Sequence, residues 1–512
     1  MFAQVLSSTT FGVNAYLVEV EIHIERGLHK FFIVGLPDSA VRESSERVFA
    51  SIKNSGFKFP KQRITVNLAP ADIKKEGSSF DLPIALGILA ATEQLKSPLL
   101  DQCVVVGELA LDGVIRPVHG ALVIAIEARN RGIKGLVVPK ENAKEAAMVD
   151  GISVFPMETL RETVDFLSGE YAMLQPYRVD HESVFRRNQQ YPIDFADVKG
   201  QENVKRALEV AAAGGHNIVM IGPPGSGKTM LAKRLPTILP PLSFDEALET
   251  TKIHSVAGLL PPDTALVSTR PFRSPHHTIS DSALVGGGTI PRPGEISLAH
   301  HGVLFLDELP EFARNVLEVL RQPLEDGKVT ISRSKMSIEY PANFMLVCAM
   351  NPCPCGNFGN PNQECSCTPA QIQRYMGKIS GPLLDRIDIH IEVPAVKYDE
   401  LSSKRVGERS EVIRERVIQA VEIQRERFEG KGLFCNADMQ SNSIKEFCAI
   451  DSTGEELLRV AMNRLGLSAR AYDRILKVAR TIADLSGSAN IRPEHLSEAI
   501  QYRSLDRDFY NV

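Results

Sequence analysis

The feature that most constrains how this chain can fold is a glycine-rich run, Gly222-Pro223-Pro224-Gly225-Ser226-Gly227-Lys228-Thr229. An apolar segment, 216–221, precedes it and a segment of helical character, 230–235, follows it. Glycines allow backbone N–H groups to point inward at a phosphate, and the following helix adds the positive end of its dipole. In such a loop Lys228 reaches the β- and γ-phosphates and Thr229 offers its hydroxyl to Mg²⁺. The order strand, loop, helix therefore predicts a nucleotide-binding domain rather than a chance Gly/Pro turn.

A second pattern supports nucleotide chemistry. The apolar segment 303–306 has the composition of a buried strand and ends in the acidic pair Asp307-Glu308. One carboxylate of such a pair can hold Mg²⁺ through water, and its neighbour can orient the attacking water. Together the two patterns predict a chain that binds and hydrolyses ATP with Mg²⁺.

Length and composition limit the remaining possibilities. A chain of 512 residues exceeds one hydrophobic core, and the usual domain size suggests about three domains. The net charge of −5 means that any nucleic-acid contact must come from local basic patches. The longest apolar stretch, 82–91, is too short to cross a bilayer. Eight cysteines without an export signal favour a metal site or core thiols over disulfides. We expect a soluble, cytoplasmic protein with no membrane partner.

The first part of the chain, 1–170, predicts an α+β domain. Segments 16–24 and 63–68 alternate apolar and polar residues as strands do, whereas 39–55 and 81–95 have helical character. A polar, aperiodic stretch follows, and we assign 171–190 as a linker.

Two stretches of this domain, 67–81 and 107–118, resemble the proteolytic domain of Lon proteases, which has an S5 domain 2-like fold. Ser79 falls where that family keeps its nucleophile, but Leu122 stands where the family's catalytic lysine is expected. A serine without a base nearby is a weak nucleophile. We therefore expect a Lon-protease-like fold without the Ser-Lys dyad, in which Ser79 sits at a turn before a helix.

The segment 191–395 resembles the core of AAA+ ATPases, a P-loop fold with a parallel sheet. The resemblance places Val198 and Gly200 over the adenine, although the same residues can simply form the turn before a helix. The apolar segment 344–350 ends in Asn351, which matches the residue that contacts the γ-phosphate and the attacking water in these proteins.

Two arginines match further AAA+ positions. Arg386 resembles the arginine finger that one subunit inserts into its neighbour's site, and the alternative is a local ion pair with Asp385 or Asp388. The segment 396–512 has mostly helical character and fits an α-helical lid, in which Arg470 matches the arginine that contacts the γ-phosphate. The whole chain thus predicts a multidomain α/β and α+β protein.

Two segments within the core are candidates for DNA contact. An insertion near 265–295 contains a Gly triplet and several prolines, which exclude a continuous helix. A hairpin is predicted at 328–340 from its β-branched alternation and short polar turn. These segments carry five basic residues that can bind phosphate or simply be solvated: Arg270, Arg273, Arg292, Arg333 and Lys335. The pair His276-His277 is a poor metal site, because adjacent residues of an extended segment point to opposite faces.

Four cysteines form a compact cluster at 353–367 with the spacing C-x-C-x₉-C-x-C: Cys353, Cys355, Cys365 and Cys367. Four thiolates can close a tetrahedral Zn²⁺ site with no open position, so the metal would be structural. Reduced surface thiols are the alternative.

Together these segments resemble one family, the Mg-chelatase-like AAA+ proteins of the ComM/YifB type. The resemblance rests on the Lon-like domain, the glycine-rich loop, Ser274-Pro275-His276-His277, Asn351 to Gly356 and the helical lid. It implies a homohexamer, formed with nucleotide or DNA, that binds single-stranded and branched DNA and drives branch migration of three- and four-stranded DNA intermediates during natural transformation. The alternative is a motor that remodels a protein partner, as the ATPase subunit of magnesium chelatase does.

Overall fold

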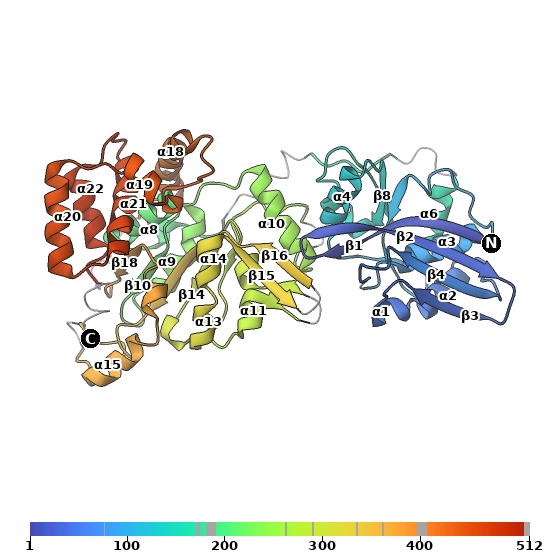
Figure 1. The fold of residues 1–512 in the computed structure, drawn as a ribbon, viewed down its shortest axis with the longest axis horizontal. Coiled ribbons are helices and arrows are strands. Elements are labelled where there is room, and N and C mark those ends of the chain that lie inside the picture. The colour runs from blue at the N-terminus through green and yellow to red at the C-terminus, as the bar shows by residue number, and fades with distance from the viewer. Residues whose placement is uncertain are drawn as a thin grey trace. The chain divides into compact units, whose positions relative to one another are not determined.

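The computed structural model describes residues 1–75, 77–169, 175–180, 191–261, 264–288, 291–333, 336–360, 363–396 and 407–505. The chain divides into two compact units, which are coloured along the sequence in Figure 1. The first unit comprises Met1–Asn188 with Phe244–Ser268, and the second comprises Gln189–Ser243 with Thr269–Val512. Most of the predicted linker at 171–190 lies outside the described residues.

The first unit is built on a seven-stranded mixed sheet with the order β3-β4-β2-β1-β5-β8-β9. Its strands are β1 (Phe2–Phe11), β2 (Asn14–Glu25), β3 (Lys30–Val34), β4 (Arg63–Ala69), β5 (Cys103–Val105), β8 (Gly135–Pro139) and β9 (Ser153–Met157). In β2 every second residue from Val18 to Ile24 is buried, which is the alternation that the sequence showed. The predicted strands near 16–24 and 63–68 are confirmed.

Helices pack on this sheet, and two of them are joined by a partly buried ion pair. The first unit contains α1 (Ser39–Arg42), α2 (Ser44–Asn54), α3 (Asp81–Ala91), α4 (Ala121–Asn130), α5 (Ala143–Ala146) and α6 (Leu160–Leu167). Helix α3 is buried along almost its whole length. Arg47 of α2 contacts Asp81 of α3 through two hydrogen bonds of 2.6 and 3.1 Å. Burial raises the pKa of the Asp81 carboxyl group, and the bonds from Arg47 oppose this shift.

The segment Phe244–Ser268, which comes between the first two β-strands of the nucleotide domain in the sequence, belongs to the first unit, which differs from the contiguous core predicted at 191–395. Helix α10 (Phe244–Val256) packs against α4, and the Ser255 hydroxyl donates a hydrogen bond to the buried carboxylate of Glu145. Burial raises the pKa of Glu145. The same carboxylate accepts a bond of 2.9 Å from the backbone N–H of Leu122. An element inserted into the ATPase sequence thus completes the first unit.

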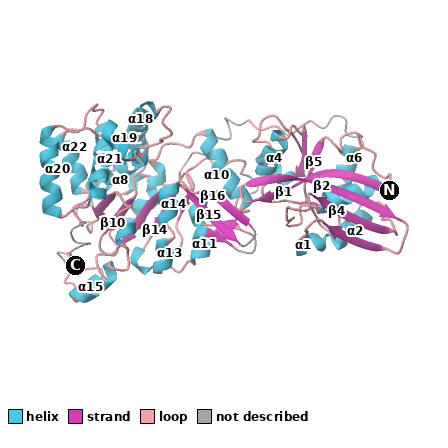
Figure 2. Cartoon of the chain, in the orientation of Figure 1, coloured by secondary structure: helices cyan, strands magenta, loops and turns pink. Residues whose placement is uncertain are grey.

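The second unit contains a five-stranded sheet with the order β11-β14-β17-β10-β18. The strands are β11 (Phe272–Arg273), β14 (Val303–Leu306), β17 (Met345–Met350), β10 (Ile218–Ile221) and β18 (Ile389–Glu392), and every pairing is parallel. The strands appear in magenta in Figure 2. The three central strands, β14, β17 and β10, are buried continuously rather than alternately, as expected of a parallel sheet covered on both faces. The predicted parallel sheet is confirmed, and its carboxyl edge gathers the residues of the site.

Helices complete the second unit. They include α8 (Glu202–Gly214), α9 (Lys228–Arg234), α15 (Pro369–Met376), α18 (Ser410–Phe428), α19 (Ser441–Phe447), α20 (Ser452–Leu465), α21 (Ala469–Leu485) and α22 (Pro493–Gln501). Both α18 and α21 pack against α8. A serine caps α21, since the Ser468 hydroxyl accepts a bond of 3.2 Å from the Ala471 N–H. None of the helices in the described ranges is long and apolar enough to cross a membrane.

A buried polar network joins α21 to the sheet. His216 lies with its Nδ1 3.2 Å from Asp388 and its Nε2 2.8 Å from Thr481. Arg474 donates a bond of 2.6 Å to the same Asp388. Burial opposes ionisation of Asp388, but Arg474 and His216 outweigh it and hold its pKa well below the usual value. Helix α21 is therefore joined to the nucleotide core through the buried carboxylate of Asp388, whose negative charge is paired.

Candidate nucleotide-binding site

The glycine-rich loop connects β10 to α9 as the sequence predicts. Gly225 and Gly227 have φ angles of 77° and 89°, the left-handed region that glycine tolerates and other residues rarely adopt. Gly222 has no room for a side chain, because an added Cβ would lie 2.1 Å from the Val393 carbonyl oxygen. The loop therefore needs glycine both for its backbone conformation and for its close packing on the residue that follows β18 (Ile389–Glu392).

Lys228 lies at the centre of this loop. Its ammonium group donates to the carbonyl oxygens of Gly222 and Pro223 at 2.7 and 2.9 Å, and it lies 3.3 Å from the Asn351 side-chain oxygen. Burial lowers the pKa of Lys228, and the nearby charge of Asp307 opposes the shift. The structure thus brings together the lysine of the loop and the asparagine at the end of β17.

The predicted magnesium ligands are also brought together. The Thr229 hydroxyl donates a bond of 2.6 Å to Asp307, whose other oxygen accepts a bond of 2.9 Å from the Glu308 N–H. A hydroxyl and a carboxylate are the hard oxygen donors that Mg²⁺ prefers, so these residues fit the cation that accompanies a nucleotide. Glu308 has a φ of 54° and an exposed side chain. This turn presents its carboxylate just beyond the end of β14.

The segment predicted to cover the adenine is tied to the loop by a residue that the sequence analysis did not assign. Val198 is buried and Gly200 has a φ of 64°. Gln201, which follows, donates from its amide to the Ser226 carbonyl at 2.7 Å and to the Pro394 carbonyl at 3.0 Å. These bonds hold the N-terminus of α8 beside the phosphate loop.

The two predicted arginines have partners within the chain. Arg470 lies 3.1 Å from Asp385, and its side chain is largely exposed. Arg386 pairs with Glu325 and donates a bond of 2.5 Å to the Pro382 carbonyl. The ion pair of Arg386 is thus formed with Glu325, while the carboxylates of Asp385 and Asp388 accept bonds from Arg470 and Arg474. Among the described residues, the buried Nε of Arg386 has no hydrogen-bond partner.

Two of the predicted DNA-binding arginines have internal partners. Arg270 donates to the carbonyl oxygens of Pro240 and His301 at 2.6 and 2.7 Å. Arg273 makes two bonds of 2.6 and 2.7 Å to Glu295. These contacts assign both side chains a structural role, which corrects the expectation that they are available for phosphate.

Three predicted basic residues remain: Arg292, Arg333 and Lys335. Arg292 is exposed on the two-residue strand β13 (Arg292–Pro293). The side chain of Arg333 and the whole of Lys335 lie outside the described residues.

The predicted hairpin is confirmed. Strands β15 (Lys328–Arg333) and β16 (Met336–Pro341) pair in antiparallel register, with Val329 opposite Tyr340. Val329, Ile331, Ile338 and Tyr340 are buried, so one face of the hairpin packs on the protein. The Tyr340 hydroxyl donates a bond of 2.8 Å to the Pro291 carbonyl, which joins the hairpin to the insertion.

Like Gln201, His277 was not assigned to the site from the sequence. His277 follows β11, and its Nδ1 lies 3.2 Å from a carboxylate oxygen of Glu308. Its place in a His-His pair suggested only a poor metal site. No spacing rule connects it to Glu308, because the contact depends on β11 and β14 lying side by side in the sheet.

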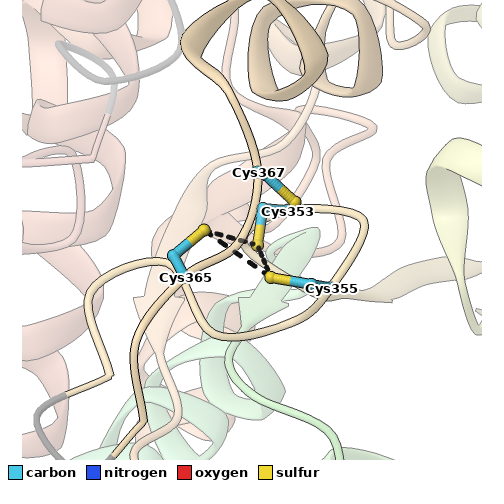
Figure 3. A group of neighbouring side chains, drawn as sticks. All are labelled: Cys353, Cys355, Cys365 and Cys367. Atoms are coloured by element: carbon cyan, nitrogen blue, oxygen red, sulfur yellow. Dashed lines mark hydrogen bonds between the residues drawn. The ribbon is translucent and has the colours of Figure 1, made fainter.

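The four clustered cysteines converge, as Figure 3 shows. The sulfur of Cys353 lies 3.3 Å from that of Cys355 and 3.6 Å from that of Cys365, and Cys355 and Cys365 are 3.6 Å apart. All four sulfur atoms lie within 4.8 Å of one another. In a tetrahedral Zn²⁺ site with bonds of about 2.3 Å the sulfurs are about 3.8 Å apart. The donor set and its spacing therefore fit zinc, and the Phe358 N–H adds a contact of 3.3 Å to Cys353.

The cysteine cluster packs against the phosphate loop. An added Cβ at Gly356 would lie 2.5 Å from the Cδ of Pro224, and Gly356 has a φ of 82°. Asn351 is two residues before the first cysteine. A metal bound by the four cysteines would thus stabilise both the phosphate loop and the end of β17.

We expect protein purified without chelator to carry about one Zn²⁺ per chain, and Cys365→Ser to lose it. Removing one thiolate leaves three ligands around the metal and exposes it to water. Metal analysis of the purified protein measures this directly, with Cys103→Ala as the control, since Cys103 is a buried thiol outside the cluster. Equal metal content in the two variants would refute a zinc role for the cluster.

The parallel sheet, the phosphate loop and the acidic strand end define an AAA+ ATPase of the Mg-chelatase type. Three segments match family descriptions: residues 194–401 match "Magnesium chelatase, subunit ChlI", 20–142 match "Subunit ChlI of Mg-chelatase", and 407–503 match "Magnesium chelatase, subunit ChlI C-terminal". The chain belongs to the ComM/YifB family.

The assignment to this family rests on relatives that match over almost their full length. Competence protein ComM of Haemophilus influenzae is 47% identical over 508 residues, which cover 99% of this chain and 98% of that protein. YifB of Escherichia coli is 48% identical over 97% of this chain and 96% of its own length. The magnesium-chelatase 38 kDa subunit of Rhodobacter capsulatus is more distant, at 25% identity over 59% of this chain and 84% of its own.

Proposed function

We propose that the protein is an ATP-driven DNA motor that assembles as a homohexamer in the cytoplasm and drives branch migration of recombination intermediates. The observation that carries the DNA part is the full-length similarity to a protein named for competence, the uptake of DNA. The ATP part is supported by the geometry, in which Thr229, Asp307 and Lys228 lie together at the carboxyl edge of the sheet.

Each residue of the site has a definite task in this proposal. Lys228 and the loop N–H groups bind the phosphates, while Thr229 and Asp307 hold Mg²⁺, which draws negative charge from the phosphates when bound. Glu308 accepts a proton from the attacking water. Asn351 orients that water beside the terminal phosphate.

Two arginines sense the same phosphate from other directions. Arg470 approaches from α21 of the same chain. Arg386 acts in the site of a neighbouring subunit, which requires it to leave Glu325 on assembly. Hydrolysis is thereby possible only in the assembled ring.

DNA contact is assigned to the basic residues at the end of the hairpin and in the insertion. Arg333 ends strand β15, Lys335 follows it in the sequence, and Arg292 is exposed on the insertion. Positive side chains on a projecting hairpin can follow a phosphate backbone. The first unit acts as a binding scaffold rather than a peptidase, because Leu122 is buried where Lon proteases have their lysine. Lys75, which precedes Ser79 by four residues, is buried and donates to the Pro70 carbonyl.

We expect single-stranded DNA to raise the ATPase rate of the wild-type protein several-fold, and Lys228→Ala to abolish turnover with or without DNA. A coupled assay at saturating ATP measures both. Turnover that depends on Lys228 but is indifferent to DNA would reject the DNA motor. It would favour the second candidate, a motor that remodels a protein partner, which is supported by the similarity to the magnesium-chelatase subunit.

A further inference from the structure

Strand β3 forms a free edge of the sheet in the first unit. The strand order places it at one end of the sheet, as Figure 1 shows, and among the described residues its backbone pairs with β4 alone. At the opposite edge, Val154 of β9 has a bridge to Tyr177. The outer side of an edge strand presents unpaired backbone N–H and C=O groups, to which another chain can add a strand.

Apolar side chains are exposed along this edge. Phe32 and Val34, two residues apart on β3, are 40% and 46% exposed. Leu28 before the strand and Leu36 after it are 83% and 54% exposed. Side chains two residues apart share one face of a strand, where they can contact alternate side chains of an added strand. The edge thus offers apolar contacts as well as backbone hydrogen bonds.

One end of the same edge is basic. Strands β3 and β4 run parallel and begin opposite each other, so the loops that precede them meet at one corner of the sheet. The rings of His29 and Phe59, one from each loop, lie 5.9 Å apart. The sequence has no aspartate or glutamate within 26–37 or 47–71. Four exposed cations of this corner have no ion-pair partner in the part of the chain that the structure describes: Arg26, Lys30, Lys58 and Lys61.

These charges distinguish between the possible occupants of the edge. A second copy of β3 would bring like charges together, which disfavours pairing of two copies. Single-stranded nucleic acid stacks its bases on exposed aromatic rings. The Arg63 guanidinium, however, already lies over the Phe32 ring, 5.1 Å from its centre. Since Val34 and its exposed apolar neighbours before and after β3 are aliphatic, the edge suits a peptide better than a nucleic acid.

We propose that β3 binds an extended acidic peptide of a partner protein, which adds to the sheet as a further strand. The backbone of β3 bonds to the peptide, and Phe32 and Val34 contact its apolar side chains. Lys30 and the neighbouring cations bind its carboxylates. This site lies in the first unit and requires neither ATP hydrolysis nor DNA, so it recruits a partner independently of the nucleotide site.

The test uses the full chain and a fluorescein-labelled peptide, long enough to span β3, in which aspartate alternates with valine. In one control peptide lysine replaces aspartate, which reverses the charge. In the other, proline replaces valine, which keeps the charge but removes backbone N–H groups that a paired strand needs. Fluorescence anisotropy measures Kd for each peptide. The aspartate–valine peptide should bind, and both controls should bind at least tenfold more weakly or not at all.

Three variants examine the surface itself. Lys30→Glu should weaken binding of the aspartate–valine peptide about tenfold or more, because it reverses a charge that faces the peptide carboxylates. Val34→Asn should weaken it about threefold through loss of apolar contact. Lys134→Glu is the matched control, since Lys134 is exposed just before β8, four strands away from β3. It should keep the wild-type Kd, and unchanged ATPase rates in all three variants check their folding.

The proposal is overturned if the aspartate–valine peptide does not bind, or if the proline peptide binds equally well. It is also overturned if Lys134→Glu weakens binding as much as Lys30→Glu does. Oligothymidylate that displaces the peptide, and that itself binds Lys30→Glu as weakly as the peptide does, would instead make this edge a nucleic-acid site. None of these outcomes depends on whether the protein is a DNA motor.

Discussion

Replacing Glu308 by glutamine is expected to lower the ATPase rate by about 10²- to 10⁴-fold, the usual contribution of a positioned general base. Glutamine keeps the size of the side chain but cannot accept the proton of the attacking water. The Thr229–Asp307 pair and Lys228 remain in place, so ATP should still bind within a few-fold of its wild-type affinity. Turnover and equilibrium binding of a fluorescent ATP analogue measure the two quantities separately.

Glu311→Gln is the matched control, because Glu311 follows in the same turn and pairs with Lys378 on the surface at 3.2 Å. It should retain turnover. ATP hydrolysis that survives in Glu308→Gln, or that falls equally in Glu311→Gln, would remove Glu308 from the role of base.

Replacing Arg386 by alanine is expected to lower turnover by about 10³-fold or more, as loss of an arginine finger does in related phosphoryl transfers. The guanidinium would otherwise stabilise charge on the transferred phosphoryl group in a neighbouring site. Its buried Nε has no hydrogen-bond partner among the described residues, which leaves it capacity for a further contact. Steady-state ATPase rates across a range of protein concentrations provide the measurement.

Glu325→Gln breaks the internal partner of Arg386 and leaves the arginine, so this control should keep turnover. Mixing Arg386→Ala with Lys228→Ala subunits should restore part of the rate, since one variant has an intact nucleotide site and the other an intact finger. Equal loss in Glu325→Gln and Arg386→Ala, with no rescue on mixing, would show that Arg386 only supports its own chain.

Local patterns predicted the parts of the site that depend on neighbouring residues in the sequence. The glycine-rich loop, the acidic pair at 307–308 and Asn351 each follow a buried strand, and parallel strands bring such ends to one edge of a sheet. The hairpin was predictable for the same reason, because alternation and a short polar turn are local signals.

Contacts between residues that are distant in the sequence could not be predicted from those local patterns. The partners of Arg270, Arg273 and Arg386 are distant in sequence, so charge alone suggested DNA or local acids instead. Helix α10 was assigned to the ATPase core because it lies between core segments, yet its buried face packs on α4 of the first unit. His277 reaches Glu308 only because β11 pairs with β14.

The most direct test of the DNA motor is migration of a synthetic four-way junction with homologous arms, followed by gel electrophoresis. Wild-type protein with ATP and Mg²⁺ should convert the junction to two duplex products, whereas Lys228→Ala and wild-type protein without ATP should leave it intact. Robust ATP hydrolysis by the wild-type protein with no conversion of the junction would contradict the account and direct the search to a protein client.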